Sequence, residues 1–76
     1  MEEVIGILTK IRPEFEFGGV ADFFAKGMLD SFDFTSLVSA LEERYNITID
    51  AGDILPRNFR SVEAIVELLG KYGVTA

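Results

Sequence analysis

The sequence contains no histidine and no cysteine. Without them, no side chain is an obvious general base that would activate a serine for nucleophilic catalysis. A disulfide framework and a thiolate zinc site are also excluded, although the redox compartment is not fixed by this. There is no Ser-Lys pair at a one-turn spacing around Ser31 and no glycine-rich phosphate loop. An enzyme is therefore disfavoured.

Basic residues and long apolar runs are also scarce. The 76 residues include 13 acidic and 7 basic side chains, a net charge of −6, which repels nucleic acid and anionic lipid and suits basic partners. No apolar run approaches the roughly 20 residues that span a bilayer. The Met1-Glu2-Glu3 start lacks the basic residues of a secretory signal. We expect one cytoplasmic, monomeric domain over residues 1–76, without a membrane span or a nucleic-acid partner.

Metal binding is disfavoured as well. Asp30 with Asp33, and Asp50 with Asp53, are the acidic pairs that come closest to a ligand pattern. Both lack the ligand spacing and the glycine of a calcium loop. We expect no specific metal site.

Apolar residues recur at helical spacing near the N-terminus and in the centre of the chain. The first pattern predicts a helix over residues 2–12, which Pro13 ends because it disfavours helical geometry before it and lacks a backbone donor. The central pattern is the clearest and predicts a helix over residues 31–45. Asp30 is a good N-cap for this second helix, and Asn46 offers a left-handed stop.

The connection over residues 13–30 is long and rich in phenylalanine. A structureless loop of this length is unusual in a compact domain. We therefore expect its aromatic rings to be held against the core. Filling a small core is the favoured role for these rings, and lining a pocket for an acyl chain is the alternative.

The C-terminal third holds shorter patterns. Residues 47–49 are β-prone but isolated, which favours an extended linker, and residues 50–55 are expected to form one short helix before Pro56. Ser61 is the predicted cap of a last amphipathic helix, which ends at Gly70 or Gly73.

Ser31 is the most informative residue of the chain. It lies in Leu29-Asp30-Ser31-Phe32-Asp33, where the long connection becomes the central helix. This run, together with Leu41-Glu42-Glu43 three turns later, resembles the phosphopantetheine attachment site of acyl and peptidyl carrier proteins. The resemblance extends over nearly the whole chain. It implies an all-α fold, a small four-helix bundle of the acyl carrier protein type with three longer helices, one short helix and a long first loop.

The resemblance also implies a chemistry for Ser31. A phosphopantetheinyl transferase would move 4'-phosphopantetheine from coenzyme A to the Ser31 oxygen, and the phosphate would lie at a helix N-terminus, which favours anions. The thiol of the arm would hold an acyl or aminoacyl thioester, loaded by an activating ligase and presented to acyl-processing enzymes of lipid or secondary-metabolite biosynthesis. The chain itself would be a carrier and not an enzyme. Without the surrounding pattern, Ser31 would be a plain helix cap or a solvated first-turn residue.

Four acidic residues are candidates for partner recognition. Asp30 and Asp33 have two compatible interpretations, as caps of the helix and as acids that meet basic residues of the transferase. Glu42 and Glu43 match acidic positions that fatty-acid carriers present to their enzymes. The alternative for both glutamates is an ordinary solvated helix face.

The chain departs from fatty-acid carriers in ways that concern the pathway. Met28 stands where those carriers usually have glycine, and Arg44 interrupts the acidic run. Arg57 and Arg60 lie in a segment that looks longer than in the fatty-acid type and is spaced like that of D-alanyl carriers. These differences predict dedicated partners that read both arginines. They leave open a fatty or polyketide acyl cargo, an aminoacyl cargo such as D-alanine, and an unmodified acidic interaction module.

Overall fold

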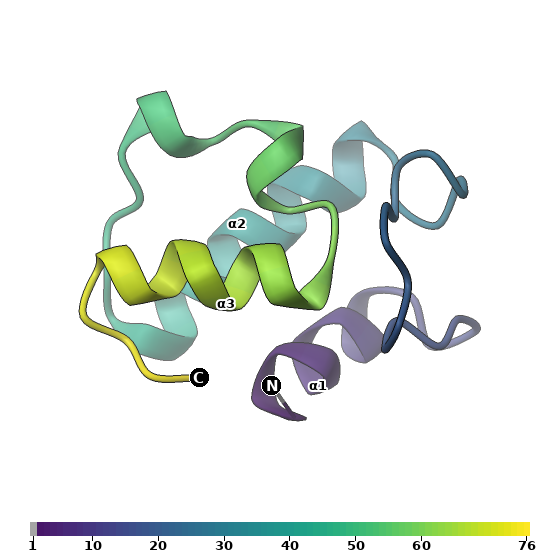
Figure 1. Cartoon of the computed structure of the whole chain (residues 1–76), viewed down its shortest axis with the longest axis horizontal. Coiled ribbons are helices and arrows are strands. Elements are labelled where there is room, and N and C mark those ends of the chain that lie inside the picture. The colour runs from purple at the N-terminus through teal and green to yellow at the C-terminus, as the bar shows by residue number, and fades with distance from the viewer. Residues whose placement is uncertain (1) are drawn as a thin grey trace.

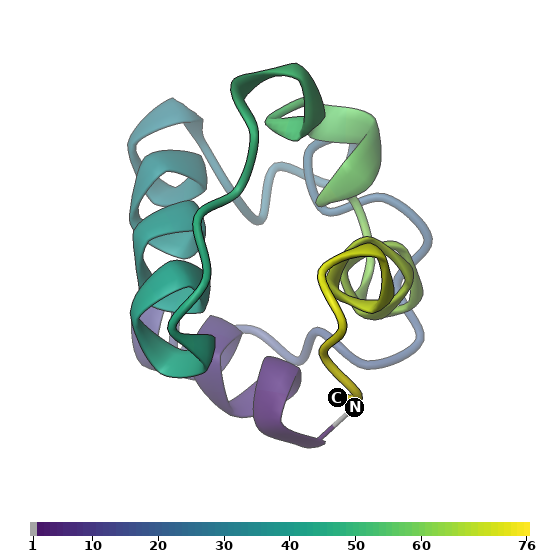
Figure 2. The same ribbon diagram turned by 90° about the vertical axis from the view of Figure 1, so that its left-hand side faces the viewer.

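Three α-helices enclose the apolar core of the computed structural model, which describes residues 2–76 (Figure 1). They are α1 (Glu2–Ile11), α2 (Ser31–Tyr45) and α3 (Val62–Lys71). Two short 3-10 helices, η1 (Ala51–Asp53) and η2 (Pro56–Asn58), interrupt the connection between α2 and α3. Figure 2 shows α2 and α3 on opposite sides, with α1 across one end of the space between them. No strand is found within residues 2–76.

The three longer predicted helices are confirmed, with ends that differ by one or two residues at most. The caps explain this agreement. Asp30 accepts a backbone hydrogen bond at the start of α2, Asn46 ends it with a φ of 54°, and the Ser61 hydroxyl caps α3 through the N–H of Ala64. Gly73, with a φ of 79°, follows the end of α3, whereas Gly70 lies inside this helix. Glycine tolerates this left-handed conformation without strain.

The fourth, short α-helix predicted over residues 50–55 is not confirmed. The segment forms η1, capped by the Asp50 carboxylate, and the chain then becomes extended at Leu55, which has a φ of −128° and a ψ of 142°. Pro56 is the physical reason, because a proline disfavours helical geometry in the residue before it. The all-α class therefore holds, but the short helix of the expected four-helix bundle is replaced by two 3-10 turns.

Aromatic rings from the long connection complete the core. Phe17 and Phe23 are fully buried and meet edge to face, with ring centroids 5.1 Å apart. The backbone N–H of Phe23 donates to the carbonyl of Arg60 at 2.6 Å, which ties the connection to the segment before α3. The other fully buried large side chains are Phe59, Leu8, Leu37, Leu41, Ile65, Leu69 and Val4. The predicted role of the phenylalanines in the core is thus confirmed.

A polar cluster holds the connection between α2 and α3 against the end of α3. The Tyr72 hydroxyl donates to Asp53 Oδ2 at 2.7 Å and accepts from the backbone N–H of Asp50 at 2.9 Å. Lys71 donates to the second oxygen of Asp53 at 3.1 Å. The hydrogen bond from Tyr72, supported by Lys71, lowers the pKa of Asp53 below its ordinary value. This cluster fixes a segment that has little regular structure.

We expect Phe23→Ala to remove a large fraction of the free energy of unfolding at 25 °C. Removing a buried phenylalanine costs about 3–5 kcal/mol, and a chain of this size has a free energy of unfolding of roughly 4–11 kcal/mol. Urea unfolding followed by circular dichroism measures the loss. Phe15→Ala, which truncates a half-buried ring of the same connection, serves as the control and should cost less. Equal losses would contradict the assignment of Phe23 to the core.

Candidate functional site

Ser31 is exposed and is the first residue of α2. A reciprocal pair of hydrogen bonds fixes the helix start around it. The backbone N–H of Asp33 donates to Asp30 Oδ1 at 2.8 Å, and the backbone N–H of Asp30 donates to Asp33 Oδ2 at 3.2 Å. Such a capping box satisfies backbone donors that the helix itself leaves unpaired. The serine therefore occupies a defined position in an otherwise solvent-facing turn.

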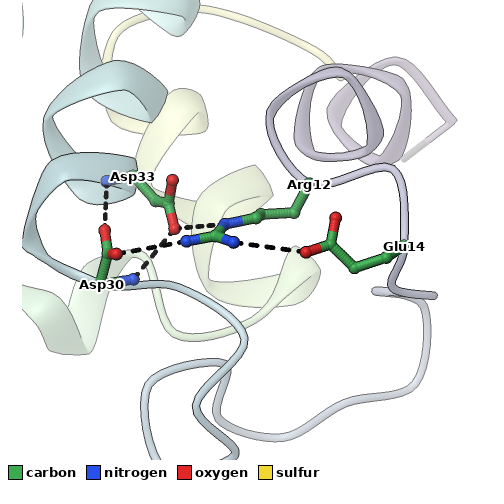
Figure 3. A network of polar contacts seen from close by, with 4 residues as sticks. All are labelled: Arg12, Glu14, Asp30 and Asp33. Atoms are coloured by element: carbon green, nitrogen blue, oxygen red, sulfur yellow. Dashed lines mark hydrogen bonds and ion pairs between the residues drawn. The ribbon is translucent and has the colours of Figure 1, made fainter.

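Arg12, which directly follows α1, binds the capping box from outside (Figure 3). Its Nε donates to Asp33 Oδ2 at 2.7 Å, and its Nη2 donates to Asp30 Oδ2 at 3.2 Å. Its Nη1 donates to Glu14 Oε2 at 3.3 Å. One guanidinium thus contacts three carboxylates, two of which flank Ser31 in the sequence.

These contacts favour the charged forms of Asp30 and Arg12. The hydrogen bond from the Asp33 backbone N–H, with help from the charge of Arg12, lowers the pKa of Asp30. Hydrogen bonding and charge from Asp33 raise the pKa of Arg12 further above its already high value. Asp33 is only 5% exposed, so its carboxylate faces Arg12 and the helix backbone. The structure confirms the capping role that the sequence predicts for both aspartates.

Phe32 lies next to Ser31 and is 78% exposed. It is the one large hydrophobic side chain that is exposed among the residues that the structure describes. An exposed aromatic ring favours contact with a partner when it adjoins polar groups. The first turn of α2 therefore offers a free hydroxyl and an apolar surface side by side.

The other predicted recognition residues lie on several parts of the surface. Glu42 is half-buried, and its carboxylate accepts the backbone N–H of Ile49 at 2.9 Å, so it holds the chain after α2. Glu43 is exposed. Arg57 and Arg60 are exposed and line an open groove of about 390 Å³ beside α3. Their role in recognition stays a prediction.

A model of the family described as phosphopantetheine attachment site matches residues 2–69 of the chain. The chain belongs to this family. Members carry covalently attached 4'-phosphopantetheine, which is therefore the cofactor here. No curated protein and no solved structure matches the chain.

The first turn of α2 fits an attached phosphopantetheine arm. It differs from the sequence-based expectation in which backbone N–H groups are free for the phosphate. Ser31 is exposed, as a site that another enzyme modifies must be. However, the Asp30 carboxylate already accepts the Asp33 N–H, so this donor is not free for a phosphate. A phosphodiester on Ser31 would lie outside the capping box, where the helix dipole still favours negative charge. When attached, the arm supplies the thiol that the chain lacks.

Two residues beside Ser31 are absent from the predicted site. The contact of Arg12 with Asp33 joins positions 21 residues apart, and no local spacing indicates it. Phe32 did carry a signal, because it falls outside the apolar stripe formed by Phe34, Leu37, Val38 and Leu41. An apolar residue out of phase with its helix indicates exposure.

None of the helices in residues 2–76 combines the length and the apolar character that crossing a bilayer requires. Within the same residues, no three acidic side chains gather in a group suited to holding a metal ion.

We expect Asp30→Asn to lower the thermal midpoint by a few degrees at pH 7. The folded state lowers the pKa of Asp30, so its ionised carboxylate stabilises the fold above the unfolded-state pKa of about 4. This stabilisation is lost as the pH falls through the lower folded-state pKa. Asparagine keeps the cap but not the charge, so the difference from the wild type should shrink below about pH 4.

Thermal scans from pH 7 to pH 3 test this expectation. Glu43→Gln, which removes an exposed carboxylate from the same helix, is the control and should leave the midpoint nearly unchanged. A deficit of Asp30→Asn that stays constant across the whole pH range would refute the role assigned to the Asp30 charge.

Proposed function

We propose that this chain is a carrier protein that holds an acyl or aminoacyl group as a thioester on 4'-phosphopantetheine attached to Ser31. The observation that carries the proposal is the family match over residues 2–69, in which one exposed serine opens α2 after an aspartate cap. Carrier domains of this family are in general not catalytic, and they interact with phosphopantetheinyl transferases and acyl-processing enzymes. The chemistry belongs to these partners.

The attachment step needs a base that accepts the proton of the Ser31 hydroxyl. Ser31 Oγ forms a bond to the phosphorus that bears the pantetheine, and the bond from that phosphorus to the nucleotide part of coenzyme A breaks. The hydroxyl proton goes to a base of the transferase, since the chain has no histidine. What the chain contributes is an exposed hydroxyl on a helix start that the capping box holds in place.

Surface chemistry supports the choice of partners. Phe32 offers the transferase an apolar contact next to the reacting oxygen. Arg57 and Arg60 are positive charges on a chain with a net charge of −6, and they border a groove that also contains Lys71, Glu63 and Glu67. The two arginines, and not the groove as a whole, suit an acidic patch on a dedicated loading or processing enzyme. Both cargo classes, acyl and aminoacyl, are compatible with such a surface.

Incubation with coenzyme A and a broad-specificity phosphopantetheinyl transferase should add one phosphopantetheine, measured as intact mass. Ser31→Ala should abolish the gain because it removes the acceptor oxygen. Ser39→Ala removes another exposed serine of α2 and should be modified like the wild type. Unchanged mass of folded wild-type protein would support the unmodified interaction module instead.

The double variant Arg57→Glu/Arg60→Glu should be modified by the broad-specificity transferase but loaded at least about tenfold more slowly by its cognate ligase, because charge complementarity governs association. Lys10→Glu/Lys26→Glu changes the net charge equally at two other exposed positions and is the matched control. Rates of thioester formation measure the effect. If both double variants lose loading equally, net charge is what matters and the arginine surface has no special role.

A further inference from the structure

Negative charge is concentrated at the start of α2. Asp30 and Asp33 flank Ser31, and Glu14, from the connection after α1, contacts the same guanidinium from the other side. Arg12 is the one cation that contacts all three carboxylates (Figure 3). Attachment of a phosphodiester to Ser31 adds another negative charge to this cluster. Like charges held close together raise the free energy of a site unless a cation offsets them.

The contact between Arg12 and Asp33 is the best defined of the three. It is the shortest, at 2.7 Å, and the Asp33 side chain is 8% exposed, against 61% for Asp30 and 51% for Glu14. A buried carboxylate without a partner is costly, so Asp33 depends on Arg12 for compensation. The same Asp33 oxygen accepts the N–H of Asp30. Arg12 therefore acts on the capping box through Asp33.

The backbone of Arg12 is fixed to α1, so its side chain is held in a defined position relative to this helix. Its backbone N–H donates to the carbonyl of Leu8 at 2.9 Å, which continues the hydrogen-bond pattern of α1 by one residue. Pro13 then turns the chain away. The guanidinium thus connects the end of α1 with the start of α2, where Ser31 is presented.

We infer that Arg12 is the positioning residue for modification of Ser31: it holds the capping box in place and offsets the charge of Asp30 and Asp33, so that the start of α2 accepts a phosphodiester. The inference rests on the proposed function of Ser31. Arg12, which directly follows α1, thereby has a role in a reaction at the start of α2. Asp33 is then bound internally, whereas Ser31 and Phe32 stay exposed to the transferase.

The test is the kinetics of phosphopantetheine transfer to Arg12→Met. We expect kcat/KM for the carrier to fall about tenfold or more, as small displacements of a reacting group allow. Arg44→Met is the matched control. Arg44 also joins α2 to α1, through Glu3 at 2.9 Å, but at the opposite end of α2. Its loss removes the same charge and should change kcat/KM less than twofold.

A second substitution that removes the unpaired charge distinguishes an electrostatic effect on the site from a general loss of stability. In Arg12→Met/Asp33→Asn, the uncompensated carboxylate is gone while the amide oxygen still accepts the Asp30 N–H. The double variant should recover part of the lost kcat/KM, and high salt should reduce the defect of the single variant. Ile65→Val, a small truncation of a fully buried side chain, gives the rate expected from lower stability alone.

The outcomes are distinct. A wild type that is not modified refutes the proposed function of Ser31. If the wild type is modified and Arg12→Met is modified as fast as Arg44→Met, the role of Arg12 is overturned. The proposed carrier function is not affected by that result. A slow Arg12→Met without rescue, no worse than Ile65→Val at equal stability, also overturns the role of Arg12. If Arg12→Met does not fold, Arg12→Lys replaces it, because lysine keeps the positive charge but lacks the planar guanidinium. A rate of modification of Arg12→Lys equal to that of the wild type, at both low and high salt, then overturns the positioning role of the guanidinium.

Discussion

The pairing of Arg12 with the nearly buried Asp33 is the interaction on which the site depends. Asp33 lies at the third position of α2, where its carboxylate accepts the N–H of Asp30 and closes the capping box. Burial of that carboxylate is tolerated because a guanidinium lies 2.7 Å from it. This contact joins the end of α1 to the start of α2, where Ser31 is exposed.

The site illustrates how a carrier differs from an enzyme in what it needs from a serine. A catalytic serine requires a base within hydrogen-bond reach, and this chain has no histidine to provide one. A serine that receives an arm requires exposure and a reproducible position. Ser31 has both, since it is solvent-facing on a helix whose first turn is capped on both sides. Phe32 adds an exposed apolar surface directly beside this serine.

The rest of the fold keeps two irregular connections in place around a thin core. Phe17 and Phe23 bury rings from the first connection, while Asp53 and Tyr72 join the second to the end of α3. Aromatic burial and charge-assisted hydrogen bonds therefore replace regular secondary structure over much of the chain. The short α-helix expected before Pro56 is not needed for this, and the proline prevents it.

The sequence by itself determined the three long helices, because their signals are local: an apolar period of 3.6 residues, a proline after α1, and the caps Asp30, Asn46 and Ser61. It also singled out Ser31 through the residues around it. Only the tertiary structure decided that Asp33 is buried against Arg12 and that Glu42 holds the backbone of Ile49. The physical reason is range: caps and helical periods act over a few residues, whereas the partner of a charged side chain depends on how distant segments pack.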